Sequence, residues 1–169
     1  MSTIIGIGGV SRSGKTRLAY KISGLFPNHS VLVMNQDEYV FEVEEIPQVR
    51  GETDWECPES IDFDHLYEHI ILASDTTDIV ILEGLLAFYD PKIEKLMNKK
   101  IFVEIPKSLF LERKINDKRW GDFPEWYMDH IWQSYEKYGK IDPADETYFI
   151  VNGENIQITD DLRNYLLDA

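Results

Sequence analysis

The chain has 169 residues, 43% of them hydrophobic and 28% charged, and its 31 acidic and 17 basic side chains give a formal net charge of −14. This length and apolar content predict one folded domain over residues 1–169 and argue against intrinsic disorder. Because so acidic a chain repels phosphate backbones and anionic lipids, we expect no nucleic acid and no membrane as partner. No obligate protein partner is evident either.

The cysteine content and the first residues indicate a reducing compartment. Cys57 is the only cysteine, so the chain can form no intrachain disulfide. The N-terminal sequence MSTIIGIGGV lacks the basic lead and long apolar run of a secretion signal. We therefore expect a cytoplasmic protein, without excluding the nucleus.

Short apolar runs alternate with longer helical patterns along the chain. The runs are rich in Ile, Val and Phe and have the length of buried strands: Thr3–Ile7, Val31–Met34, Asp78–Leu82, Ile101–Ile105 and Tyr148–Val151. The helical candidates between and after them are Lys15–Leu25, Ile61–Ala73, Pro91–Met97, Lys107–Lys118, Pro124–Tyr138 and Asp160–Leu167, the last with Thr159 and Asp160 as capping candidates. This order predicts a three-layer α/β fold around a five-stranded parallel sheet.

Two segments, residues 36–60 and 119–124, do not fit this alternation. Long irregular segments in a folded domain are usually functional loops. We interpret residues 36–60 as an acceptor-binding region. Together with the basic residues that precede it, the second segment is interpreted as a short lid over residues 113–124.

Residues 9–16, GVSRSGKT, match the phosphate-loop pattern G-x-x-x-x-G-K-[ST], directly after the first predicted strand and before a helical pattern. Glycines let backbone N–H groups turn toward phosphate oxygens, and the N-terminus of the following helix favours an anion. The lysine reaches the outer phosphates and the threonine hydroxyl ligates Mg²⁺. We therefore predict ATP and Mg²⁺ as cofactors, with these candidate binding residues: Gly9, Ser11, Arg12, Ser13, Gly14, Lys15, Thr16 and Arg17.

Spacing excludes two other nucleotide-binding classes. Ser11 stands where the dinucleotide fingerprint G-x-G-x-x-G requires its third glycine. No glycine follows an aspartate by three residues, and Asn98-Lys99-Lys100 is followed by Ile101, so the D-x-x-G and N-K-x-D motifs of GTPases are absent. A small-molecule kinase is favoured over a GTPase or a mechanical ATPase.

Two carboxylates are expected at the carboxyl edge of the sheet, where open α/β sheets bind ligands. Glu83 ends the third predicted strand and would lie beside the phosphate loop if the first and third strands are neighbours; a helix cap or a solvated side chain is the alternative. Asp37 follows the second strand and would accept the proton of an attacking hydroxyl, or simply form a turn.

Charge is segregated along the chain. Residues 37–78 hold 14 acids and one base, whereas residues 92–119 hold nine bases and four acids. The bases Arg113, Lys114, Lys118 and Arg119 could neutralise a migrating phosphoryl group as a closing lid. The acidic segment would repel a phosphorylated acceptor, so a neutral or cationic acceptor is expected. For any single charge, a solvated surface is the alternative.

Taken together, these segments resemble the nicotinamide riboside kinases, in the uridine kinase-like branch of phosphate-loop kinases. The resemblance rests on GVSRSGKT, NQDEY, DWECPESIDFDHL, VILEGLLAF, RKINDKR and PEWYMDHIWQSYEKY, in this order from about Ile4 to the final helix. It implies the P-loop NTPase fold for nearly the whole chain.

The resemblance also implies roles for matching residues. Asp37 would be the base on the acceptor 5′-hydroxyl, and Glu83 would hold the metal together with Thr16. Trp55 would lie by the base, and Glu56, which replaces the aspartate usual in the family, would bind the ribose diol. With the nearby Tyr39, the expected substrate-binding residues are Asp37, Tyr39, Trp55 and Glu56, and the expected catalytic residues are Asp37, Lys15, Arg113, Lys114 and Arg119. At helical spacing, Trp126, Tyr127, Trp132 and Tyr135 are interpreted as core.

The expected function is ATP-dependent phosphorylation of the 5′-hydroxyl of a ribonucleoside. The first choice is nicotinamide riboside, giving nicotinamide mononucleotide for NAD salvage, because its cationic ring suits an acidic, aromatic pocket. A uridine/cytidine kinase or another small-metabolite kinase is the alternative. From a different class, a catalytically silent nucleotide-binding regulatory module also stays open.

Overall fold

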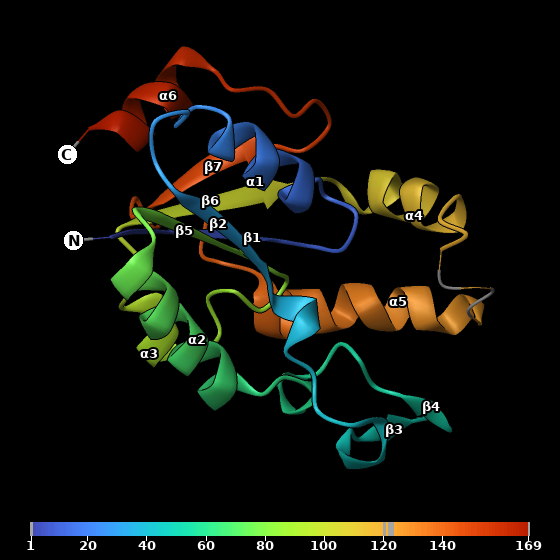
Figure 1. Cartoon of the computed structure of the whole chain (residues 1–169). Coiled ribbons are helices and arrows are strands. Elements are labelled where there is room, and N and C mark those ends of the chain that lie inside the picture. Colours follow the sequence, from blue (N-terminus) through green and yellow to red (C-terminus); the bar gives the residue numbers. More distant parts are fainter. Residues whose placement is uncertain (1, 120, 122–123, 169) are drawn as a thin grey trace.

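A parallel sheet of five strands forms the centre of the computed structural model, which describes residues 2–119, 121 and 124–168. The strand order is β2-β5-β1-β6-β7 (Figure 1). Their bounds are β1 (Thr3–Gly9), β2 (Val31–Asn35), β5 (Ile79–Glu83), β6 (Lys99–Glu104) and β7 (Tyr148–Asn152). The predicted α/β fold is confirmed, and each predicted apolar run coincides with a strand except at Asp78 and Ile105, which lie just outside β5 and β6. β6 begins two residues before its apolar run, because Lys99 pairs with Ile5 of β1.

Six α-helices accompany the sheet in the described part of the chain: α1 (Lys15–Ser23), α2 (Phe63–Thr76), α3 (Pro91–Glu94), α4 (Lys107–Ile115), α5 (Glu125–Ser134) and α6 (Asp160–Leu167). The Thr159 side chain caps α6 by accepting a hydrogen bond from Leu162 N, as the sequence predicts. α3 is shorter than predicted because Leu96 N and Met97 N bond three residues back, in turns. α5 continues into a π-helical turn, Tyr135–Gly139.

The helices cover both faces of the sheet, as Figure 1 shows. Because side chains alternate along a strand, Ile5 and Ile81 pack under α1 and α6, whereas Ile4 and Val80 pack under α2 and α3. A third apolar cluster joins α4 and α5 to the end of β1 and to β6, through buried residues that include Phe110, Tyr127 and Ile131. These buried side chains pack α4 and α5 against the edge of the sheet at which its strands end.

The segment between β2 and α2 is irregular, as predicted. It contains the 3₁₀ turns η1 (Gln36–Glu38), η2 (Val43–Glu45) and η3 (Pro58–Ser60), and the short hairpin β3 (Gln48–Val49) and β4 (Glu52–Thr53). An antiparallel bridge between Val40 and Ile61 joins the two ends of this segment. Figure 1 shows the hairpin on the side of α5 that faces away from α4. Among the described residues, no helix has the length and apolar character needed to cross a membrane.

Candidate active site

The phosphate loop joins β1 to α1 at the carboxyl edge of the sheet. Gly9 and Gly14 have left-handed φ angles of 142° and 105°, and a Cβ on Gly14 would lie 2.8 Å from Ile156 Cγ1, so glycine is required there. Ser13 Oγ is fully buried and has no hydrogen-bond partner among the described residues. An orphaned hydroxyl inside a loop of left-handed glycines at a helix N-terminus fits a bound phosphate chain.

Lys15 is buried under this loop, where its Nζ donates a hydrogen bond to Val10 O at 2.9 Å. Burial lowers the pKa of the Lys15 ammonium. Three carboxylates oppose this shift and favour the charged form: Glu83, Asp37 and Glu56. The lysine of the motif is thus surrounded by the acids that the sequence singled out.

Glu83 lies directly beside the phosphate loop, because β5 and β1 are neighbours and Glu83 pairs with Ile7. Its side chain is buried and its Oε1 accepts a hydrogen bond of 2.7 Å from Thr16 Oγ1. Burial raises the pKa of Glu83, while Lys15 and the Thr16 hydroxyl act in the opposite direction. Glu83 is therefore neither solvated nor a helix cap.

Thr16 and Glu83 are a hard-oxygen pair of the kind Mg²⁺ accepts. Among the described residues, no group of three or more His, Cys, Asp and Glu side chains is arranged to hold a metal ion. A magnesium ion at this pair would therefore need phosphate oxygens as further ligands, which is the arrangement of phosphate-loop enzymes.

Asp37 lies on η1, which is hydrogen-bonded to the end of β2 and to the segment after β5. Asn35 Oδ1 accepts from Asp37 N at 2.9 Å, and the buried Gln36 accepts at Oε1 from Leu86 N at 2.8 Å. The turn is thus formed by Asn35, while the Asp37 carboxylate is left exposed next to Lys15 and Glu83. Gln36, which locks η1 to the segment after β5, was not singled out from the sequence. Its only sequence signal is a polar residue at a strand end.

Glu56 shares this electrostatic environment. Burial, together with Asp37 and Asp54, raises the pKa of Glu56 to about 7, against the opposing effects of Lys114 and Lys15. The Trp55 ring beside it is 39% exposed. Tyr39, which was also predicted to bind the acceptor, contacts α2 instead, where its hydroxyl lies 3.1 Å from His69 Nδ1.

The predicted lid bases fall into separate environments. Arg113 donates to the backbone carbonyls of Arg12 and Gly153, both at 2.9 Å, so its guanidinium braces the phosphate loop. Arg119 donates twice to Asp117, at 2.8 and 2.9 Å, and these bonds hold the Asp117 pKa well below its usual range. Lys114 is the lid base that influences both Lys15 and Glu56. Trp120, Asp122 and Phe123 of the predicted lid lie outside the described residues.

The remaining candidates for phosphate binding are Arg12, Arg17 and Ser11. Arg12 has a left-handed φ of 64° and lies 3.8 Å from Asp117, and Arg17 is exposed on α1. Ser11 is half-buried in the loop. The interpretation of Trp126, Tyr127, Trp132 and Tyr135 as core is confirmed for Tyr127 on α5 and for Tyr135 in the π-helical turn that follows it, both of which are buried. Trp126 and Trp132 are partly buried against the same apolar cluster.

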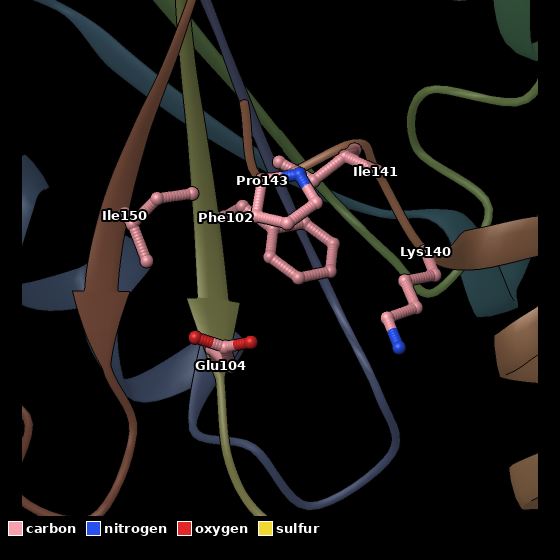
Figure 2. Close-up of a pocket in the computed structure, with 6 residues that line it drawn as sticks. All are labelled: Phe102, Glu104, Lys140, Ile141, Pro143 and Ile150. Atoms are coloured by element: carbon pink, nitrogen blue, oxygen red, sulfur yellow. The ribbon is translucent and has the colours of Figure 1, made fainter. Parts of the chain in front are cut away.

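The described residues line two hollows outside the group around Lys15. The smaller, about 20 Å³, is lined by β6, β7 and residues 140–143, as Figure 2 shows, and has room for little more than one water molecule. The larger, about 290 Å³, lies between the β3–β4 hairpin and α5; it is lined by Val49, Arg50, Trp126, Asp129, His130 and Gln133. There the Arg50 guanidinium stacks on the Trp126 ring at 4.9 Å.

The sequence is similar to that of known kinases. Residues 71–138 match the model of the Phosphoribulokinase / Uridine kinase family. A uridine kinase of Bacillus thuringiensis (strain Al Hakam) is 31% identical over 137 residues, which are 66% of this chain and 65% of that protein. A uridine kinase of Bacillus cytotoxicus is 30% identical with the same coverage. The chain thus spans slightly less than two thirds of these curated relatives.

Solved structures resemble the fold over most of its length. A possible uridine kinase from Bacillus stearothermophilus aligns with a TM-score of 0.54 and 18% identity, over 88% of both chains. A sugar kinase from Janibacter sp. HTCC2649 aligns with 0.61 and 17%, over 92% of this chain and 88% of that one. A gluconokinase from Sinorhizobium meliloti 1021 aligns with 0.59 and 14%, over 98% and 89%. The chain is thus similar in sequence to uridine kinases, and its five-stranded α/β fold is that of the P-loop kinases.

Proposed function

We propose that this protein is a magnesium-dependent ATP kinase that phosphorylates the 5′-hydroxyl of a ribonucleoside. The observation that carries the proposal is the gathering of four predicted side chains around the Lys15 ammonium: Asp37, Glu56, Glu83 and Lys114. They come from distant parts of the sequence and meet at the sheet edge where such folds bind ligands. The sequence similarity to uridine kinases supports the same activity.

Each side chain then has a defined task. ATP with Mg²⁺ supplies the phosphoryl group and neutralises part of its charge. Lys15 and the loop amides hold the phosphates, and Thr16 and Glu83 hold the metal. Asp37 accepts the proton of the acceptor hydroxyl, Glu56 binds the ribose diol, and Lys114 reaches toward the transferred group.

Uridine or another pyrimidine nucleoside is the acceptor that the sequence similarity supports. Nicotinamide riboside is the second candidate, because the half-exposed Trp55 lies in a segment with 14 acids and one base, which favours a cationic ring. Neither acceptor is anionic, which suits the carboxylates around the site.

A panel of nucleosides tests the proposal directly. Initial rates with ATP and Mg²⁺ are measured for uridine, cytidine, nicotinamide riboside, adenosine and gluconate, with the 5′-phosphate product identified by mass. We expect a ribonucleoside to be the best substrate. Absence of phosphorylation of every nucleoside, with ATP still bound, would instead support a silent nucleotide-binding module.

The assignment of the base has its own test. Asp37→Ala and Asp37→Asn should lower turnover at least about a hundredfold, the usual contribution of general-base catalysis, while ATP affinity persists. The matched control is Glu38→Gln, on the adjacent exposed position of η1. Near-normal turnover in both Asp37 variants would remove Asp37 from the mechanism.

A further inference from the structure

Two side chains of α5 hold the part of the chain that carries Trp55 and Glu56. Tyr127 Oη donates to Thr53 O at 3.0 Å and accepts from Trp55 N at 3.2 Å. His130 Nε2 lies 2.7 Å from Asp54 Oδ1. The two residues are three positions apart on α5 and therefore point from the same side of the helix.

These contacts are sheltered from solvent. Tyr127 is 2% exposed, and the side chains of His130 and Asp54 are 18% and 14% exposed. Asp54 Oδ1 also accepts from Glu56 N at 3.1 Å, so the carboxylate joins His130 to the backbone of Glu56. Bonds of this kind are stronger than exposed ones, because water competes for them less.

The segment so held has little regular structure of its own. Residues 54–57 lie between the two-residue strand β4 and the turn η3. Besides the contacts with α5, Asp54 N bonds to Pro47 O and Ser60 Oγ donates to Trp55 O, both within the same excursion from the sheet. The side chains of α5 therefore connect this segment to the rigid part of the molecule.

We propose that Tyr127 and His130 are positioning residues for the acceptor and together form an α5 latch, defined by their bonds to Thr53, Asp54 and Trp55. The inference rests on the proposed function, because the latch acts through Glu56 and Trp55. Without it, the Glu56 carboxylate would sample several positions before meeting the ribose. The hydrogen bonds that define the latch join α5 to residues 53–55 and include no residue of the phosphate loop, so the binding of ATP should not depend on them.

Kinetics on the best nucleoside test this role with Tyr127→Phe, which removes one oxygen, and with His130→Ala. The acceptor KM should rise roughly threefold to tenfold in Tyr127→Phe, which loses bonds to neutral backbone groups, and roughly tenfold to a hundredfold in His130→Ala, which loses a bond to a carboxylate, while the ATP KM stays within about twofold. His130→Gln, whose amide can still donate to Asp54, should restore most of the affinity. Gln133→Ala, one turn further along α5, is the matched control. An unchanged acceptor KM in both latch variants, or an equal rise in both KM values, overturns the proposal.

Coupling between the partners adds a second criterion. If His130 acts through Asp54, then His130→Ala combined with Asp54→Ala should be no worse than the more damaging single variant. Additive effects would mean that His130 acts on the acceptor by another route, and would overturn the positioning role.

Amide hydrogen exchange separates this proposal from the proposed function. Trp55 N–H and Glu56 N–H should exchange roughly tenfold faster in Tyr127→Phe and His130→Ala than in the parent protein or in Gln133→Ala. If no nucleoside is phosphorylated but these amides respond, the latch exists and the kinase proposal fails. If nucleosides are phosphorylated and the amides do not respond, the latch proposal fails alone.

Discussion

The addition of one methyl group at Gly84, directly after Glu83, should have a large effect on stability and activity. A Cβ built at Gly84 would lie 2.5 Å from the Gln36 Cβ and would also contact Gln36 Oε1. Real carbon atoms do not approach so closely, and the clash includes the root of the Gln36 side chain, so a rotamer change cannot relieve it. Gly84→Ala must therefore displace η1, which carries Asp37.

The cost has two parts. Overpacking of a tight site costs about 1–3 kcal/mol. Displacing Gln36 also leaves the buried Leu86 N–H without its acceptor, which costs about 1–3 kcal/mol. Together they predict a loss of about 2–6 kcal/mol, or a Tm lower by roughly 4–24 °C for a chain of this size.

Activity should fall as well, because a displacement of Asp37 by about 1 Å lowers turnover by roughly a hundredfold. Thermal unfolding and nucleoside kinase rates are measured on Gly84→Ala beside Gly24→Ala. At Gly24 the φ is −66° and the nearest atom to a new Cβ is 3.4 Å away, so this control should keep full activity and lose no stability. A Gly84→Ala protein with parental Tm and turnover would refute the proposed packing of η1 against the segment after β5.

Three further predictions concern individual charges. Glu83→Gln should raise the Mg²⁺ concentration needed for half-maximal rate several-fold, measured by magnesium titration at saturating ATP, because a neutral amide replaces the carboxylate proposed to hold the metal beside Thr16; an unchanged requirement would contradict the metal role. Burial raises the pKa of Glu56 to about 7, so kcat/KM for the acceptor should rise with pH through about 7 as the carboxylate ionises, and Glu56→Gln should lose this step. Since an acid with a raised folded-state pKa binds its proton more tightly when folded, Glu56→Gln should also be the more stable protein above pH 7, as measured by urea unfolding. Lys114→Ala should lower kcat, whereas Arg113→Ala should mainly raise the ATP KM because its guanidinium braces the phosphate loop; the reverse pattern would exchange their roles.

The fold could be predicted from the sequence because each buried strand is a short apolar run and each helix has its own periodic pattern. Ile79–Glu83 is buried along its whole length, which produces the continuous run Ile-Val-Ile-Leu. The predicted ends of the strands and helices were less accurate where something other than the burial of apolar side chains determines them. Strand pairing extends β6 over Lys99 and Lys100, and turns shorten α3, and neither effect leaves a signal in hydrophobicity.

The site was only partly predictable for a related reason. The GVSRSGKT pattern identifies Lys15 and Thr16 because the backbone there must close around phosphates, and the sheet order then brings Glu83 beside them. Which base of the lid faces Lys15 depends on how α4 ends, so Lys114, Arg113 and Arg119 looked equivalent in sequence. Tyr127 was interpreted only as a core residue and His130 was not singled out, because a hydrogen bond across more than 70 residues has no local signature.

The bridge between Val40 and Ile61 has a consequence for how the sequence of this protein could be altered. Between these two bridged residues the chain leaves the sheet and returns at one place, and within this excursion Thr53, Asp54 and Trp55 are hydrogen-bonded to Tyr127 and His130 of α5. We therefore expect residues 41–60 to be replaceable as one unit. If the proposed function holds, exchanging this unit together with the matching positions of α5 should change the acceptor while the buried strands keep their sequence.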